Sequence, residues 1–129
     1  MNIIADASAF LAVALEEAGE SYVVEHTKGC NLVSPEVLPY EIANALIAGA
    51  KRRRITARDV HRAFSRSQRI VVQLVPVNVY DALQVALRLG IYAYDAYYLQ
   101  CAIETGFPLL SLDGGMNERA KALGIEVVG

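Results

Sequence analysis

Four acidic residues of this 129-residue sequence stand where their carboxylates could share a metal ion. Asp6 and Asp113 each follow a short apolar segment, whereas Glu41 and Asp95 lie within longer segments that have a helical pattern of apolar and aromatic residues. A carboxylate packed against a protein core is unfavourable unless it is paired or binds a cation. The types and settings of these residues therefore indicate a site for a divalent cation.

The ligand chemistry favours Mg²⁺ or Mn²⁺ over zinc, because carboxylates without thiolates or imidazoles are the donors that hard cations prefer. Neither His26 nor His61 stands at a metal-ligand spacing, and the two cysteines are far apart in the chain. A dication held by carboxylates can polarise a phosphodiester, lower the pKa of a bound water and stabilise the leaving oxygen. The hydroxyls of Ser8 and Ser111, each two residues from an acid, could orient a carboxylate or a bound water.

Each acid taken alone also has an ordinary structural explanation. Asp6 could cap a helix, and Asp113 could belong to a turn with the glycine pair that follows it. Glu41 would face solvent if the helix phase differed by one position, and Asp95 could be an acid at a helix N-terminus. The metal hypothesis therefore depends on the order and setting of the four residues together.

Short apolar segments alternate with helical segments along the chain. We expect strands at 2–5, 32–33, 70–77, 108–112 and 125–128. We expect helices at 9–15, 20–27, 36–53 with a bend near Pro39, from Thr56 onward, and at 81–89, 95–105 and 117–123. The expected helix N-caps are Ser8, Ser34 and Thr56, the last in a capping box with Asp59.

This alternation predicts an α/β fold, doubly wound, with a mostly parallel sheet of short strands and helices on both faces. In such sheets ligands bind beyond the carboxyl ends of the strands, which is where Asp6 and Asp113 stand.

The length suits one domain spanning residues 1–129, and a hydrophobic fraction of 54% is enough to fill its core. No apolar run reaches the roughly 18 residues that span a bilayer. Because Asp6 interrupts the segment where a signal peptide would be apolar, we expect a cytoplasmic protein without a membrane segment.

At the four acids the sequence resembles the PIN-domain family, and specifically the VapC-type toxins of bacterial and archaeal toxin–antitoxin pairs. The resemblance extends over nearly the whole chain. It is carried by the strand and D-x-S motif of 3–8, the E-x-x-N helix of 39–46, the third acidic motif in 94–99, and the fourth motif and closing strand in 109–113 and 122–128.

The resemblance implies an endoribonuclease that depends on Mg²⁺ or Mn²⁺. Because the sequence has four acids and no competing nucleophile motif, we expect no covalent enzyme intermediate. It assigns the metal-binding and catalytic roles to Asp6, Glu41, Asp95 and Asp113. It also implies an RNA substrate, a homodimer and inhibition by a small antitoxin encoded alongside.

Some polar neighbours follow the family pattern and others depart from it. Asn44 matches the asparagine of the second motif, and Ser111 stands where a threonine is common, which keeps a hydroxyl. The pair Gly114-Gly115 after the fourth acid is more flexible than the usual stretch. Some relatives have a further acid where this chain has Asn117 and Glu118, so the number of metals stays open.

The basic residues are concentrated in one region. Eight of the twelve lie between Lys51 and Arg69, with Asp59 as the only acid among them. Arg58, Arg62, Arg66 and Arg69 recur every three or four residues and so form an arginine stripe on one helix face. Arginine suits bidentate contact with phosphate, so this stripe could hold an RNA backbone. A solvated helix face and a docking surface for an acidic antitoxin tail remain alternatives. The candidate RNA contacts are Arg54, Arg58, Arg62 and Arg66.

Aromatic residues surround the third acid. We interpret these side chains as core or dimer packing, with stacking on nucleobases as the alternative. The tyrosines concerned are Tyr92, Tyr94, Tyr97 and Tyr98.

Three other functions would also suit an α/β fold with acids at the ends of its strands. A hydrolase with an aspartate nucleophile after the first strand would need a second aspartate where this chain has Ser8. A phospho-accepting receiver would want a lysine near the end of the penultimate strand, and no lysine lies between Lys51 and Lys121. The main alternative is a catalytically inactive or regulatory RNA-binding or interaction module. Such a module would normally have lost one of the four acids, and all four are present.

Overall fold

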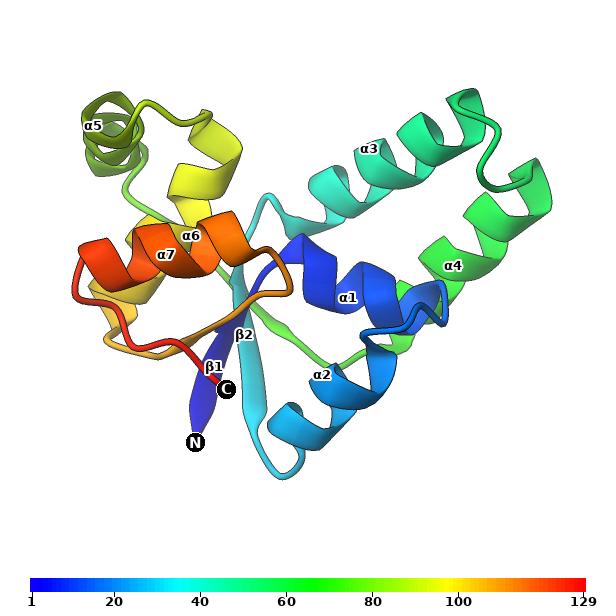
Figure 1. Cartoon of the computed structure of the whole chain (residues 1–129), viewed down its shortest axis with the longest axis horizontal. Coiled ribbons are helices and arrows are strands. Elements are labelled where there is room, and N and C mark those ends of the chain that lie inside the picture. Colours follow the sequence, from blue (N-terminus) through cyan, green and yellow to red (C-terminus); the bar gives the residue numbers. More distant parts are fainter.

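The central sheet of the protein is short-stranded and entirely parallel. A computed structural model describes residues 1–129 and places four strands in the order β3-β2-β1-β4 (Figure 1). The strands are β1 (Asn2–Ala5), β2 (Asn31–Pro35), β3 (Gln73–Val75) and β4 (Leu109–Leu110). The predicted strand at 125–128 is wrong as a strand, because it is reduced to one parallel bridge between Leu109 and Val127.

All seven predicted helices are present with shifted ends. In Figure 1, α1 to α4 gather on one side of the strands and α5 to α7 on the other, which confirms the layered α/β class. Packing follows the same division, since α1 contacts α2, α3 and α4, whereas α5 contacts α6. No helix has both the length and the apolar character needed to cross a bilayer. The helices are α1 (Ala7–Ala14), α2 (Glu20–Thr27), α3 (Leu38–Lys51), α4 (Ala57–Arg69), α5 (Val79–Leu89), α6 (Ala93–Thr105) and α7 (Gly114–Ala122).

The first helix begins earlier than predicted because its N-cap is Asp6 and not Ser8. Asp6 has extended backbone angles (φ −91°, ψ 175°), and its carboxylate accepts a hydrogen bond from the backbone N–H of Ala9. The carboxylate thereby satisfies one of the N–H groups left free at a helix start. The residue that ends β1 therefore also starts α1.

The segment around Ser34 was predicted to start a helix but continues β2. The fully buried Ser34 hydroxyl donates a 2.6 Å hydrogen bond to the carbonyl oxygen of Ala5 on the neighbouring strand. This bond ties the end of β2 to β1 and keeps the chain extended through Pro35. Helix α3 starts only at Leu38, without a side-chain cap, and Pro39 lies in its first turn. Because the first turn needs no donor from its N–H groups, Pro39 opens the helix and does not bend it.

Other helix ends follow the sequence closely. Thr56 caps α4, and Thr56 and Asp59 form the predicted capping box, each side chain accepting from the backbone N–H of the other. Gly90 and Gly106 end α5 and α6 in the left-handed conformation, with φ of 66° and 74°. Glycine adopts this conformation without the steric cost that a Cβ adds.

The register of the sheet brings the ends of β1 and β4 together. Ile4 pairs with Leu109 and Ala5 with Leu110, all of them almost completely buried. The next residues therefore leave the sheet side by side, and the backbone N–H of Asp6 donates to the carbonyl oxygen of Leu110 at 3.3 Å. The carboxyl edge of the sheet is thus where two of the predicted site segments meet.

Candidate metal centre

Asp6 is the most deeply buried of the four predicted acids, with 5% of its surface exposed. One carboxylate oxygen accepts from the Ser8 hydroxyl and the other from the Ser111 hydroxyl, both at 2.5 Å. Burial raises the pKa of Asp6, and the two serine hydroxyls partly oppose that rise. A buried carboxylate needs such donors, because desolvation disfavours its charged form.

The same two hydroxyls also fix the loop that carries the fourth acid. The Ser8 hydroxyl oxygen accepts from the backbone N–H of Leu112, and the Ser111 hydroxyl oxygen accepts from the backbone N–H of Asp113, both at 3.0 Å. Each serine therefore donates to Asp6 and accepts from the segment after β4. The structure places both predicted hydroxyls between the first and fourth acids.

Glu41 lies in the first turn of α3, and its Oε2 atom is buried without a hydrogen-bond partner. The buried Tyr98 hydroxyl lies beside this carboxylate. Burial raises the pKa of Glu41 to about 7, with the charges of Asp95 and Asp6 adding to the rise and the Tyr98 hydroxyl opposing it. The predicted inward orientation of this side chain is present in the structure.

Asp95 lies in the first turn of α6 and is partly buried. Burial raises its pKa, the guanidinium of Arg119 lowers it, and the charge of Asp113 raises it again. Arg119 projects from α7, and its Nη1 atom is 3.9 Å from Asp95 Oδ2. Arg119 is the one cation paired with an acid of this group.

Asp113 is exposed and caps α7, accepting a 2.9 Å hydrogen bond from the backbone N–H of Gly115. A Cβ atom at Gly115 would lie 3.3 Å from Asp113 Oδ1 and 3.5 Å from Arg119 Nη1. The glycine therefore leaves space for both charged groups. Asp6 and Asp113 both cap helices and both belong to the group of four acids. The structural role as a helix cap therefore does not exclude the proposed role as a metal ligand.

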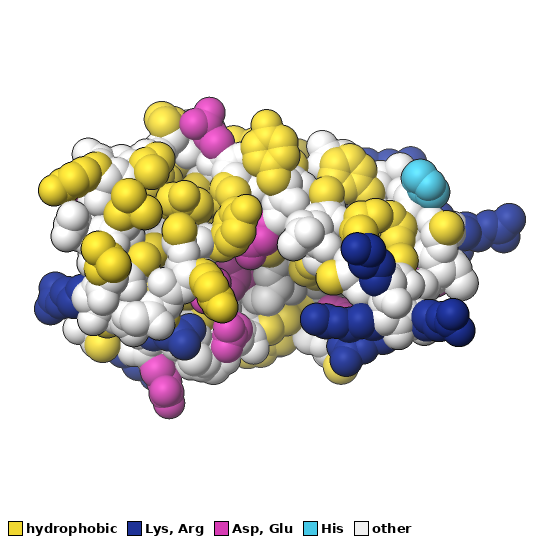
Figure 2. Space-filling view, turned by 90° about the horizontal axis from the view of Figure 1, so that it is seen from above, with side chains coloured by type: hydrophobic (Ala, Val, Ile, Leu, Met, Phe, Trp, Pro, Cys, Tyr) yellow, Lys and Arg dark blue, Asp and Glu magenta, His cyan; other side chains and the backbone are white.

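The four acids come from four separate elements and influence one another electrostatically. Asp6 and Asp95 both raise the pKa of Glu41, and Asp113 raises that of Asp95. Figure 2 shows acidic side chains inside a hollow near the middle of the face seen from above. The hollow lies between the layer of α5 and α6 and that of α3 and α4.

This group fits a hard divalent cation by two observations. Its donors are all carboxylate oxygens, and one of them, Glu41 Oε2, is buried and unpartnered. No three acidic side chains are close enough together to form a ready-made ligand shell. A cation bound here would therefore keep several waters, as Mg²⁺ usually does in proteins.

Three further residues join this group. Tyr98 and Arg119 contact its acids as described, and the Asn117 amide donates to the carbonyl oxygen of Ser111 at 3.1 Å. Asn117 Oδ1 is buried without a partner, whereas Glu118 is exposed. Asn44 is exposed on α3 and forms no side-chain hydrogen bond. The sequence signal for Tyr98 was its position one helical turn after Asp95, whereas no motif distinguished Arg119.

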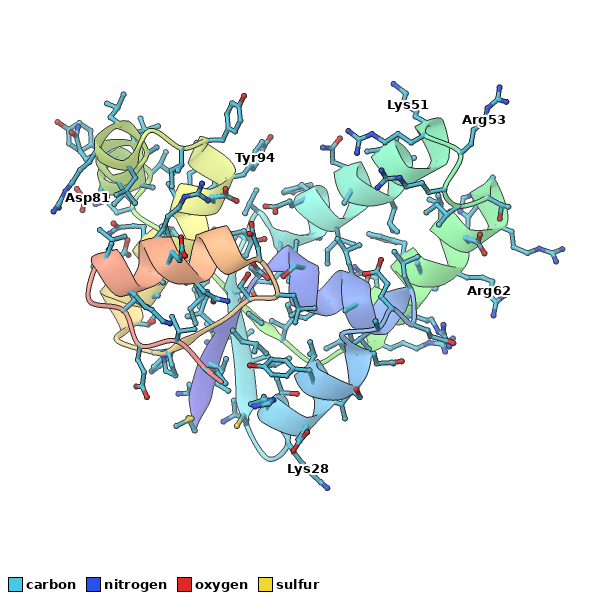
Figure 3. The ribbon with its side chains drawn as sticks, in the orientation of Figure 1. Lys28, Lys51, Arg53, Arg62, Asp81 and Tyr94 are labelled. Atoms are coloured by element: carbon cyan, nitrogen blue, oxygen red, sulfur yellow. The ribbon has the colours of Figure 1, made fainter.

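The arginine stripe lies on α4, away from the acids. Arg66 pairs with Glu16 and donates a 3.5 Å hydrogen bond to the carbonyl oxygen of Ala14, so it also has a structural role. Figure 3 shows Arg62 extending outward from α4, and in Figure 2 the Lys and Arg side chains gather over α3 and α4, beside the acidic hollow. Arg62, Arg66 and Arg69 line a surface depression together with His61 and Ser65. Arg54 is exposed in the turn between α3 and α4.

We predict that Ser111→Ala weakens Mn²⁺ binding by about 10- to 100-fold, the usual effect of removing a group that orients a metal ligand. The substitution leaves Asp6 Oδ2 buried without its hydroxyl donor and removes the acceptor of the Asp113 N–H. Isothermal titration calorimetry with Mn²⁺ measures the change. Ser111→Thr should retain most of the affinity, and Ser67→Ala, which removes a buried hydroxyl on α4, should retain all of it. Unchanged affinity in Ser111→Ala would refute the positioning role.

We also predict that the metal-free protein loses stability as the pH rises from about 4.5 to about 7. The pKa of Glu41 is higher in the folded state, so its contribution is fully present below the unfolded value and disappears as the folded carboxyl ionises. Urea unfolding at a series of pH values in EDTA tests this. Glu41→Gln should flatten the pH dependence, whereas Glu25→Gln on the exposed face of α2 should not. A wild-type protein whose stability increases over this range would contradict the assignment.

Comparisons with known proteins agree with this architecture. A model of the PIN domain matches residues 3–122. PAE2754 from Pyrobaculum aerophilum is 26% identical, with a TM-score of 0.66 over 99% of this chain and 84% of that one. VapC20 of Mycobacterium tuberculosis, a toxin that cleaves the sarcin–ricin loop, is 17% identical and shares the fold, with a TM-score of 0.68 over 98% of this chain and 99% of that one. No curated protein matches the sequence. Because the family match spans nearly the whole chain, this protein belongs to the PIN domain family.

Proposed function

We propose that this protein is a ribonuclease that depends on Mg²⁺ or Mn²⁺ and hydrolyses RNA phosphodiesters with a water nucleophile. One observation carries the proposal: acids on four separate elements, near enough to influence one another electrostatically, lie at the carboxyl edge of a parallel sheet in a chain that belongs to the PIN domain family. A bound dication would polarise the scissile phosphate and lower the pKa of a coordinated water.

The residues of the chain would divide the remaining work. Asp6, Glu41, Asp95 and Asp113 would hold the metal, and the two serine hydroxyls keep the first of these carboxylates in one orientation. The unpartnered oxygen of Glu41 is free to accept a metal or a coordinated water. Arg119 lies close enough to Asp95 to share in balancing the negative charge.

We further propose that residues 1–129 act as one nuclease domain and as the toxin of a VapBC-type pair. The sequence motifs resemble those toxins, and the fold is shared with one of them. The partners would be an RNA substrate in the cytoplasm, a small antitoxin and a second copy of the chain. A small protein with a DNA-binding N-terminus, encoded beside this one, would support the pairing.

We expect that Asp6→Asn and Asp95→Asn each abolish cleavage of RNA while leaving the fold intact. Each substitution removes a negative oxygen ligand but keeps the size and shape of the side chain. Cleavage of a structured RNA panel is followed with Mn²⁺ and with EDTA, and circular dichroism checks the fold. Asp81→Asn is the matched control, because Asp81 is exposed on α5, far from the hollow (Figure 3). Normal cleavage by both site variants would end the proposal.

The arginine stripe gives a separate expectation for RNA binding. Arg62→Ala should weaken binding similarly for all sequences and reduce the slope of log K against log salt by about 1, because one phosphate contact is lost. Fluorescence anisotropy of a labelled RNA between low and moderate salt measures the slope. Arg88→Ala, which removes an exposed cation from α5, is the control. If both variants show the wild-type slope, α4 does not contact the RNA backbone.

A further inference from the structure

One buried hydroxyl lies among the acids without a hydrogen-bond partner. It belongs to Tyr98, which stands on α6 one helical turn after Asp95 and is fully buried. A buried hydroxyl without a partner is unfavourable, because it gives up its bonds to water and gains none from the protein. A phenylalanine would fill almost the same space without that cost. Core packing alone therefore does not explain why this residue is a tyrosine.

The charges that act on this hydroxyl show where it lies. Burial raises the pKa of Tyr98. The charges of Glu41, Asp6 and Asp95 raise it further, so three of the four acids are close enough to influence one phenol. A phenol whose pKa lies above its ordinary value of about 10 stays protonated at neutral pH. Tyr98 can therefore donate a hydrogen bond here, but it cannot act as an anionic metal ligand.

The contacts of the neighbouring acids leave one acceptor for this donor. Asp6 already accepts from two serine hydroxyls, one at each carboxylate oxygen. Asp95 is paired with the guanidinium of Arg119. Glu41, in contrast, has a buried oxygen, Oε2, that accepts from no group. The free donor on α6 and the free acceptor on α3 therefore lie beside each other in the same buried site.

The two side chains differ in their freedom to move. Tyr98 is among the largest fully buried side chains of the protein, so packing fixes its ring. The Glu41 carboxylate stands at the end of three rotatable bonds. A metal-binding carboxylate is oriented when a second group of the protein holds the oxygen that does not face the metal. A fixed hydroxyl can therefore determine which way the Glu41 carboxylate turns.

We propose that Tyr98 is a positioning residue of the metal centre: its hydroxyl donates to one carboxylate oxygen of Glu41 and so directs the other oxygen toward the bound dication. The inference rests on the proposed function and gives an uncharged residue a part in metal binding. It parallels the arrangement at Asp6, where two serine hydroxyls hold the carboxylate.

The test compares Mn²⁺ binding by Tyr98→Phe and by the wild type. Phenylalanine keeps the ring and its packing and removes only the hydroxyl. Electron paramagnetic resonance measures the free Mn²⁺ in each titration, so weak binding is also quantified. The titrations are made at pH 8, above the pKa of Glu41 of about 7, so that protonation of this carboxylate does not account for a difference. We expect Tyr98→Phe to bind Mn²⁺ about tenfold more weakly, at the low end of the range for groups that orient a metal ligand.

Two further variants separate positioning from a general effect on the helix. Tyr97→Phe is the matched control, because Tyr97 is the next tyrosine on α6 and packs against Tyr94, with ring centroids 6.2 Å apart. It should bind Mn²⁺ as the wild type does. In a Glu41→Ala background, Tyr98→Phe should cause no further loss of affinity, because the hydroxyl acts through this carboxylate.

The stability of the metal-free protein is the measurement that a purely structural hydroxyl would change. In EDTA at pH 5 the Glu41 carboxyl is mostly protonated, and the Tyr98 hydroxyl has no hydrogen bond to lose. Tyr98→Phe should therefore unfold at the same urea concentration as the wild type or at a higher one. Unfolding at a clearly lower concentration would assign the hydroxyl to the fold and overturn the proposal.

The outcomes separate this inference from the function on which it rests. Equal Mn²⁺ affinity in Tyr98→Phe and the wild type would refute the positioning role, even if both proteins cleave RNA. A wild type that binds Mn²⁺ but cleaves no RNA would instead refute the ribonuclease, and the affinity of Tyr98→Phe would still decide the role of the hydroxyl. A wild type that binds no Mn²⁺ would overturn this inference together with the metal centre.

Discussion

Burial of carboxylates at one edge of the sheet is the constraint on which the rest of the structure depends. Asp6, Glu41 and Asp95 all have raised pKa values, chiefly because they are buried. The protein compensates the desolvation of these three carboxylates unevenly. Asp6 receives two hydroxyl donors and Asp95 a guanidinium, whereas one oxygen of Glu41 receives nothing. A folded chain tolerates such a residue where a ligand later supplies the missing interaction, as a dication would here.

The parallel sheet is what brings these groups together. Its register places the ends of β1 and β4 side by side, and the hydroxyls of Ser8 and Ser111 then join the two loops through Asp6. Helices α3 and α6 add their acids from first turns, where N-terminal N–H groups favour negative charge. Short strands are sufficient for this purpose, because only their carboxyl ends carry the site.

The sequence predicted the fold class, the seven helices and the acids that gather at the sheet edge, because each follows from local patterns. It failed where tertiary contacts decided the outcome. Ser34 resembles a helix cap, but its hydroxyl binds the Ala5 carbonyl across the sheet and extends β2. Arg119 reaches Asp95 only through the packing of α7 near α6, which no spacing in the chain reveals. The metal-binding role of the acids itself remains a proposal.

The placement of charge implies a division of labour in RNA binding. Arginines on α4 can attract the backbone over a distance of about 10 Å, the Debye length at moderate salt, without entering the hollow. Arginines crowded among the carboxylates would compete with a dication for the same oxygens, so the placement of most cations on α3 and α4, with only Arg119 beside Asp95, leaves the acids available to the metal that we propose.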